Sequence, residues 1–140
     1  KLSKIIIVLG AMYEYREELE NMIKHSDIPV ELYQNTDKMP DLMYQCDMAL
    51  SSGGLTAWEF GFLGVLNIII PYSNREKLSA KFMNDNHYAY MIEVNDNINH
   101  SELAEKINNI LNSDYRKSIK KLKNELNPRG VDKFVEHIMK

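Results

Sequence analysis

Short apolar segments alternate with longer amphipathic segments along the whole chain. The apolar segments are uninterrupted and rich in Ile and Val, which is typical of strands buried on both faces of a parallel sheet. Their positions predict five strands, over residues 4–10, 29–33, 47–51, 66–71 and 89–94.

Between these strands, apolar residues recur at the spacing of a helix. The pattern predicts helices over residues 14–25, 38–46, 55–64, 75–86, 101–112 and 131–140. Asp37 is the predicted N-cap of the second helix, and Pro40 falls in its first turn. Gly64 is the predicted end of the third helix, and Ser101 the predicted cap of the fifth.

The regular alternation of strand and helix predicts an α/β fold. Such chains form a parallel sheet with helices on both faces, as in Rossmann-like domains. The 140 residues suffice for one domain with a substantial core, so we expect residues 1–140 to form a single domain. The first strand begins almost at once, which suggests that the chain is part of a longer protein.

The charge pattern argues against a nucleic-acid partner. The formal net charge is −3, and no basic stripe follows the body of the chain, whereas phosphate neutralisation needs clustered Lys and Arg. The one basic run, residues 115–125, is interpreted as the solvated face of a helix.

The sequence also indicates a compartment. Cys46 is the only cysteine, so it cannot form an internal disulfide, and its apolar surroundings predict a buried structural thiol. No signal peptide is visible, and no apolar run approaches the roughly 20 residues of a membrane-spanning helix. We therefore expect a cytoplasmic domain without a transmembrane segment.

The segment SSGGLTAWE, residues 51–59, joins the third predicted strand to the third predicted helix. Ligands of open parallel sheets bind at this type of junction, where a helix N-terminus offers unpaired N–H groups and glycines let a phosphate approach the backbone. One interpretation is a diphosphate cradle built from Ser52, Gly53, Gly54 and Thr56. Glu59, one turn later, could then accept hydrogen bonds from a ribose diol.

The same residues allow a purely structural interpretation. Thr56 and Glu59 have the spacing of a capping box, with Thr56 as N-cap and Glu59 as the third helical residue. The glycines would then only form a tight turn. The local pattern leaves both interpretations open.

Other chemistry is not indicated by the sequence. The four histidines lack the HxxxH and HExxH spacings of metal sites, and no G-x-S-x-G nucleophile elbow occurs. His87 is interpreted as a surface or half-buried residue. We expect neither a metal nor another cofactor.

Residues 35–83 resemble the C-terminal half of GT-B fold sugar-nucleotide enzymes. The resemblance is to the UDP-sugar hydrolases of pseudaminic acid biosynthesis and their spore-coat polysaccharide relatives, and more distantly to the lipid II-forming N-acetylglucosaminyltransferases. These groups share the pattern D-x-x-[IL]-S-x-x-G-x-[ST]-x-x-E, preceded by a Met-centred helix. The matching residues here are Met39, Asp47, Ser51, Gly54, Thr56, Glu59, Gly64, Pro71 and Asn74.

The resemblance implies a uridine nucleotide-sugar as ligand. By analogy, Gly53, Gly54 and Thr56 would meet the diphosphate, Glu59 would hold the ribose, and Asn74 would reach the sugar. The catalytic base and the other wall of the cleft would belong to an N-terminal half. This chain alone is therefore expected to bind a uridine nucleotide weakly and to catalyse nothing.

Three positions depart from the family pattern. The glycine-rich loop after the first strand is reduced to Gly10, which we retain as a candidate ligand contact. Arg75 replaces the Gln of an Asn-Gln pair, and it could meet a carboxylate or phosphate on a different sugar. Asn67 replaces the proline of a G-x-P turn.

Several functions remain open from the sequence. The parent protein could be a glycosyltransferase or a UDP-sugar hydrolase. A non-catalytic interaction or regulatory domain on the same fold is the alternative, and it would have a blocked glycine turn. A receiver or flavodoxin-like module is disfavoured, because no acidic cluster follows the first strand.

Overall fold

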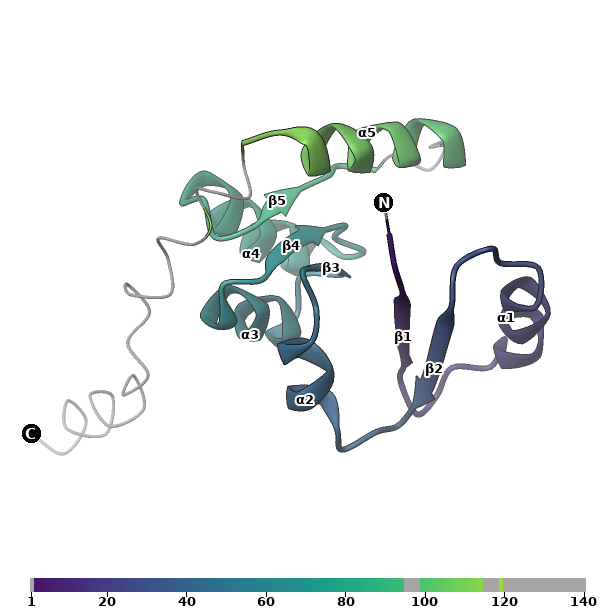
Figure 1. Ribbon diagram of the computed structural model, residues 1–140. Coiled ribbons are helices and arrows are strands. Elements are labelled where there is room, and N and C mark those ends of the chain that lie inside the picture. Colours follow the sequence, from purple (N-terminus) through teal and green to yellow (C-terminus); the bar gives the residue numbers. More distant parts are fainter. Residues whose placement is uncertain (1, 95–98, 115–118, 120–140) are drawn as a thin grey trace, which may run out of the picture. The chain divides into compact units, whose positions relative to one another are not determined.

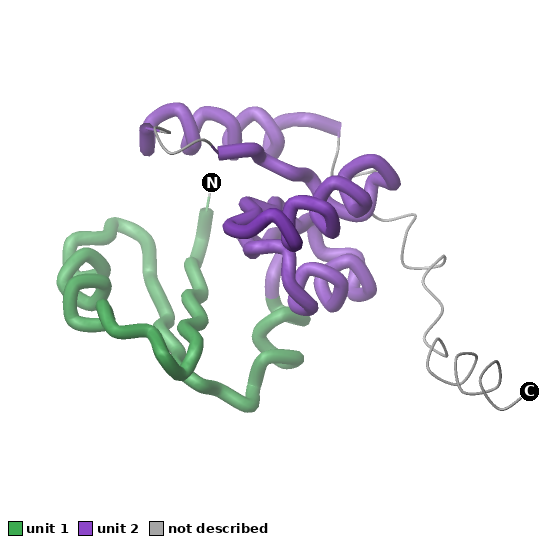
Figure 2. The backbone as a smooth tube through the Cα atoms, turned by 180° about the vertical axis from the view of Figure 1, so that it is seen from behind, with its two compact units in different colours: residues 1–45 green, residues 46–140 purple. Residues whose placement is uncertain are grey.

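The computed structural model describes residues 2–94, 99–114 and 119. The chain divides into two compact units, residues 1–45 and 46–140 (Figures 1 and 2). The predicted helix over residues 131–140 and most of the basic run at 115–125 lie outside the described residues.

The first unit is a parallel β-α-β arrangement followed by a short helix. It contains β1 (Ile5–Leu9), α1 (Arg16–Ile23), β2 (Val30–Gln34) and α2 (Met39–Tyr44). The two strands pair in parallel, with Ile5 opposite Val30. The predicted strands and helices are confirmed, but the predicted burial of the strands on both faces is not. Only Leu9 of the two strands is buried, and most of the other strand residues are half-buried.

The second unit contains a three-stranded parallel sheet. Its elements are β3 (Met48–Ser51), α3 (Leu55–Leu63), β4 (Leu66–Ile69), α4 (Asn74–Asp85), β5 (Tyr90–Met91) and α5 (His100–Asn112). The strand order is β3-β4-β5, with Ser51 opposite Ile69 and Ile69 opposite Met91. Because β4 is the central strand, all four of its residues are buried, as the apolar run predicted.

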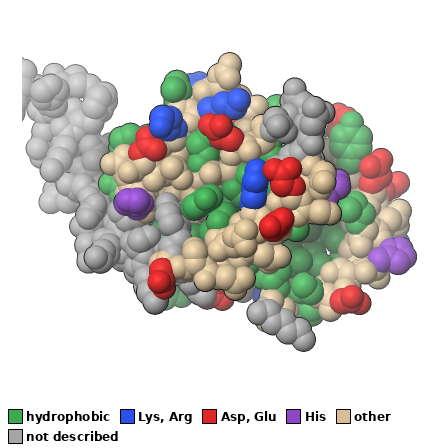
Figure 3. All heavy atoms as spheres, turned by 90° about the horizontal axis from the view of Figure 1, so that it is seen from above, with side chains coloured by type: hydrophobic (Ala, Val, Ile, Leu, Met, Phe, Trp, Pro, Cys, Tyr) green, Lys and Arg blue, Asp and Glu red, His purple; other side chains and the backbone are tan. Residues whose placement is uncertain are grey.

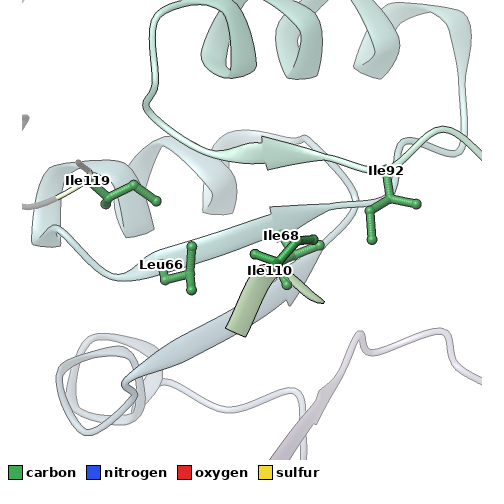
Figure 4. Packing of buried hydrophobic residues seen from close by; sticks show 5 residues of the cluster. All are labelled: Leu66, Ile68, Ile92, Ile110 and Ile119. Atoms are coloured by element: carbon green, nitrogen blue, oxygen red, sulfur yellow. The ribbon is translucent and has the colours of Figure 1, made fainter. Parts of the chain in front are cut away.

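Helices cover both faces of this sheet. On one face, Ile69 packs with residues of α3 and α4, in a cluster made of Ala57, Ile69, Ala80, Met83 and Ala89. On the other face, Figure 4 shows the second cluster, which includes α5 and is made of Leu66, Ile68, Ile92, Ile110 and Ile119. The α/β fold with parallel strands and helices on both faces is therefore confirmed.

The helix ends differ in part from the predictions. Gly64 ends α3 in the left-handed conformation, at φ 71°, and Pro40 lies in the first turn of α2, both as predicted. Asp37 is not an N-cap, because α2 begins one residue later, after Lys38. Ser101 is also not a cap. Asn99 caps α5 instead, and its side chain accepts hydrogen bonds from the N–H groups of Ser101 and Glu102.

The surface carries mixed charges. On the face shown in Figure 3, acidic and basic side chains are interspersed among polar and apolar ones. None of the helices in the described part of the chain is both long enough and apolar enough to span a bilayer. Cys46 is half-buried, and His87 is exposed.

Candidate functional site

The glycine turn lies at the carboxyl end of β3. The last residue of this strand is Ser51. In the turn that follows, Ser52 and Gly54 are exposed, whereas Gly53 between them is buried. Gly54 is extended and is the N-cap residue of α3. This is the strand-to-helix junction at which open parallel sheets bind ligands.

Gly53 occupies a position that only glycine fits. Its φ is +104°, and a Cβ there would lie 3.1 Å from Ile69 Cγ2 and 3.3 Å from the backbone oxygen of Glu76. A side chain would therefore be strained by the backbone conformation and crowded by the end of β4 and the first turn of α4. At Gly54, by contrast, a Cβ would meet no atom within 4 Å.

The start of α3 has no side-chain cap. Its N-cap residue is Gly54, and Thr56 is the second residue inside the helix. The capping box predicted for Thr56 and Glu59 is therefore wrong. Since Gly54 has no side chain to accept their hydrogen bonds, the N–H groups of the first turn keep the positive potential of a helix N-terminus.

The neighbouring helix α4 has the capping box instead. The Ser73 hydroxyl accepts a hydrogen bond from the Glu76 N–H at 3.3 Å, and Glu76 Oε2 accepts from the Ser73 N–H at 3.1 Å. Glu76 Oε2 also accepts from the Tyr72 N–H at 2.9 Å, and the Ser52 hydroxyl lies close enough to the same carboxylate to lower its pKa. The amino end of α4 is thus already occupied by the chain's own carboxylate.

These contacts affect the ionisation of Glu76. Partial desolvation is the largest influence and raises its pKa, but it is outweighed by the hydrogen bonds from Tyr72, Ser52 and Ser73. The net result is that the pKa of Glu76 lies below its ordinary value of 4.5. Glu76 is therefore a carboxylate at neutral pH.

The structure brings most of the predicted site residues into the same unit. Ser52 and Gly53 contact Glu76 in the first turn of α4, and that turn begins with Asn74 and Arg75, both exposed. The remaining predicted residues of this unit lie on α3, where Thr56 is half-buried and Glu59 is exposed. Gly10 belongs to the other unit, where it is exposed after β1.

Two large apolar side chains flank the glycine turn. Leu55 is the first residue of α3, and Tyr72 directly precedes the cap of α4. Their side chains are 84% and 95% exposed, so nothing in the described residues covers them. The corner therefore combines uncapped N–H groups, hydroxyls and an apolar rim.

Glu76 is not among the site residues that the sequence pattern predicts. The signal was present, because Ser73 and Glu76 have the same S-x-x-E spacing that we assigned to Thr56 and Glu59. Within the described residues, no three His, Cys, Asp or Glu side chains gather as metal ligands would.

A family model decides what kind of domain this is. The model of the glycosyltransferase family 28 C-terminal domain matches residues 2–138, which is nearly the entire chain. The chain belongs to the glycosyltransferase family 28 C-terminal domain family. The more specific resemblance, to UDP-sugar hydrolases or lipid II-forming transferases, stays a prediction.

A curated relative and a solved structure extend this comparison. The uncharacterized protein MJ1062 of Methanocaldococcus jannaschii is 31% identical over 126 residues, which cover 77% of this chain and 26% of that protein. The structure described as the glycotransferase of kitacinnamycin matches with a TM-score of 0.61 at 19% identity, over 87% of this chain and 38% of that one. The family 28 domain described here therefore shares the fold of a glycosyltransferase structure. It spans about a quarter of its curated relative.

Proposed function

We propose that this family 28 domain binds the nucleoside diphosphate part of a sugar-nucleotide donor, with UDP as the nucleotide. The observation that carries the proposal is the glycine turn at the amino end of α3. Gly54 leaves the backbone accessible there, and the first turn has no side-chain cap. Membership of a glycosyltransferase family supports the donor as the ligand.

The diphosphate would bind at the start of α3. The N–H groups of Leu55 and Thr56 belong to the uncapped first turn, where unpaired N–H groups and the helix dipole favour an anion. The Thr56 hydroxyl could add a hydrogen bond to a phosphate oxygen, whereas the single O–H of Ser52 could do so only by leaving the Glu76 carboxylate. Because the amino end of α4 is filled by Glu76, α3 is the better of these two helices for the phosphates.

Glu59 would bind the ribose. It lies one turn after Thr56 and is exposed, so its carboxylate is available to accept hydrogen bonds from two vicinal hydroxyls. The apolar rim of Leu55 and Tyr72 suits the flat faces of a base or sugar. Asn74 and Arg75, at the start of α4, would face the sugar.

The family favours a transferase over a hydrolase as the parent protein, because its model is that of a glycosyltransferase domain. In a GT-B enzyme the donor lies between two halves, so we propose an N-terminal half as the partner of this domain. A non-catalytic domain with a blocked turn is less well supported, since Gly54 is open.

Calorimetry with UDP and with inorganic pyrophosphate tests the proposal. We expect the 140-residue chain to bind UDP weakly, with a Kd on the order of 1 mM, because the proposed N-terminal half would supply the other wall of the cleft. Absence of both binding heat and thermal stabilisation at several millimolar UDP would contradict the proposal.

Glu59→Ala separates the ribose contact from the phosphate contact. Loss of hydrogen bonds to a charged group costs about 1.5–3 kcal/mol, so UDP affinity should fall roughly 10- to 100-fold while pyrophosphate affinity stays unchanged. Glu105→Ala, at an exposed position of α5, is the matched control and should change neither affinity. Equal losses for both ligands in Glu59→Ala would show that Glu59 does not contact the ribose.

A further inference from the structure

Glu76 connects two loops that are distant in sequence. Its carboxylate accepts hydrogen bonds from the N–H groups of Tyr72 and Ser73 in the loop before α4. The Ser52 hydroxyl, which belongs to the glycine turn before α3, lies close enough to the same carboxylate to lower its pKa. One side chain therefore joins the two turns at the carboxyl ends of the neighbouring strands β3 and β4.

The backbone of the glycine turn also rests on Glu76. A Cβ built on Gly53 would lie 3.3 Å from the Glu76 backbone oxygen and 3.4 Å from its Cβ. Gly53 is buried in this contact, whereas its neighbours Ser52 and Gly54 are exposed. The packing contact of Gly53 and the proximity of the Ser52 hydroxyl to the carboxylate thus place the same short segment against the first turn of α4.

A tether of this kind is needed because the segment is intrinsically flexible. Consecutive glycines have more backbone freedom than any other pair of residues, so the turn can adopt many conformations when it is unrestrained. Only the conformation that leaves the start of α3 open can receive an anion. If that conformation is populated only in part, the apparent affinity falls by the same fraction.

We infer that Glu76 is a positioning residue for the glycine turn, which it holds open at α3 by restraining Ser52 and Gly53. The inference rests on the proposed function, because it assigns Glu76 to the same anion site. Glu76 itself binds no ligand in this account. It acts through the backbone conformation of the turn.

Capping of α4 is the competing role for Glu76, and the two roles can be separated. Ser73→Ala removes the serine half of the capping box but leaves Glu76 free to bond Ser52. Glu76→Ala removes both roles of the carboxylate and leaves only the backbone and Cβ contacts with Gly53. Glu76→Gln keeps an oxygen that accepts the backbone N–H groups and an amide that can donate to the Ser52 hydroxyl, so the turn should stay in place.

The experiment measures the order of the turn with and without ligand. In the ¹⁵N-labelled chain, we expect NMR order parameters of about 0.85 for the Gly53 and Gly54 amides, as in rigid backbone. In Glu76→Ala they should fall below about 0.6, and UDP affinity should fall at least about fivefold. In Glu76→Gln, the glycine order parameters and the UDP affinity should both stay unchanged. Ser73→Ala should lower the melting temperature while leaving the glycine order parameters unchanged.

Each outcome bears on the inference. Unchanged glycine order and UDP affinity in Glu76→Ala would overturn it, and so would an equal loss of order in Ser73→Ala, because capping alone would then explain the data. If Glu76→Ala does not fold, Ser52→Ala provides the same test through the order parameter of Gly53. Loss of glycine order in a chain that binds no UDP would support the tether and refute the proposed function.

Discussion

At the residue scale, Gly53 and Gly54 illustrate two different uses of glycine. Gly53 has a φ of +104° and is packed against Ile69 and Glu76, so the fold requires glycine there. Gly54 has an extended conformation that any residue can adopt, with open space where a Cβ would lie. If Gly54 is constrained, the constraint comes from a ligand rather than from the fold.

Substitutions at the two glycines should therefore differ. Gly53→Ala should destabilise the chain by about 1–3 kcal/mol, because it places a Cβ at positive φ in a crowded site. Gly54→Ser should leave the stability equal or higher, since Ser is a favoured N-cap residue. Its hydroxyl would accept hydrogen bonds from the first-turn N–H groups, and UDP binding should weaken. Urea denaturation and calorimetry of both variants check this, and equal stability losses would contradict it.

Asn67 is a buried residue whose side-chain amide is only partly hydrogen-bonded. It is fully buried on β4, and its Oδ1 accepts a hydrogen bond from Ser51 at 3.0 Å, while Nδ2 has no hydrogen-bond partner among the described residues. A buried unpaired donor is destabilising. The position that departs from the family's proline pattern thus also carries an unsatisfied hydrogen-bond donor in the core.

Replacing Asn67 by an apolar residue should remove the unsatisfied donor from the core. Ser51→Ala alone should cost about 1–3 kcal/mol, since it removes the partner of Asn67 Oδ1 and leaves the amide unsatisfied. The double variant Ser51→Ala/Asn67→Val should recover that loss, because an apolar pair needs no hydrogen bond and Val suits a central strand. Chemical denaturation of both variants measures the difference, and a double variant less stable than the single one would contradict the argument.

At the scale of elements, the helix caps decide which helix ends are available to ligands. α4 and α5 begin with side-chain caps, Ser73 with Glu76 in one and Asn99 in the other. α3 begins with Gly54 and has none. Among the helices described in the second unit, α3 is therefore the one whose first turn is left for an external anion.

The cap of α5 offers a direct check on this assignment of caps. Asn99→Ala should destabilise the chain by about 1 kcal/mol, because its side chain accepts two backbone hydrogen bonds at the start of the helix. Ser101→Ala is the matched control, and it should change the stability by less than about 0.5 kcal/mol. If thermal unfolding showed a larger loss of stability in Ser101→Ala than in Asn99→Ala, Ser101 would be the cap, as the sequence predicted.

At the scale of the whole molecule, three carboxylates among the described residues make the stability depend on pH. The pKa of Glu31 is lowered chiefly by its hydrogen bond from Lys4, and that of Asp85 chiefly by its hydrogen bond from Lys81. The pKa of Glu76 is lowered as well, despite its desolvation, by the hydrogen bonds from Tyr72, Ser52 and Ser73. These groups bind protons more weakly in the folded chain than in the unfolded chain.

The sign of the pH dependence follows. A depressed carboxyl pKa stabilises the fold above the unfolded pKa, which is 4.5 for Glu31 and Glu76 and 3.8 for Asp85. That stabilisation is lost as the pH falls through the lower folded values. The urea midpoint should therefore be constant near neutral pH and decrease below about pH 4.5. In Glu76→Gln the urea midpoint should decrease less steeply as the pH falls. A midpoint that rises on acidification would contradict the assignment.

The sequence by itself determined the order of strands and helices, since uninterrupted apolar runs and helical periodicity are local properties of the chain. It also located the glycine turn, because strand, glycines and helix are contiguous at residues 51–59. Only the tertiary structure decided which S-x-x-E segment is the capping box. Thr56 and Ser73 have the same spacing to a glutamate, but α3 starts at Leu55, before Thr56, whereas α4 starts directly after Ser73. The contact of Glu76 with Ser52 could not be predicted either, because it depends on β3 and β4 lying side by side in a particular register, which no local pattern encodes.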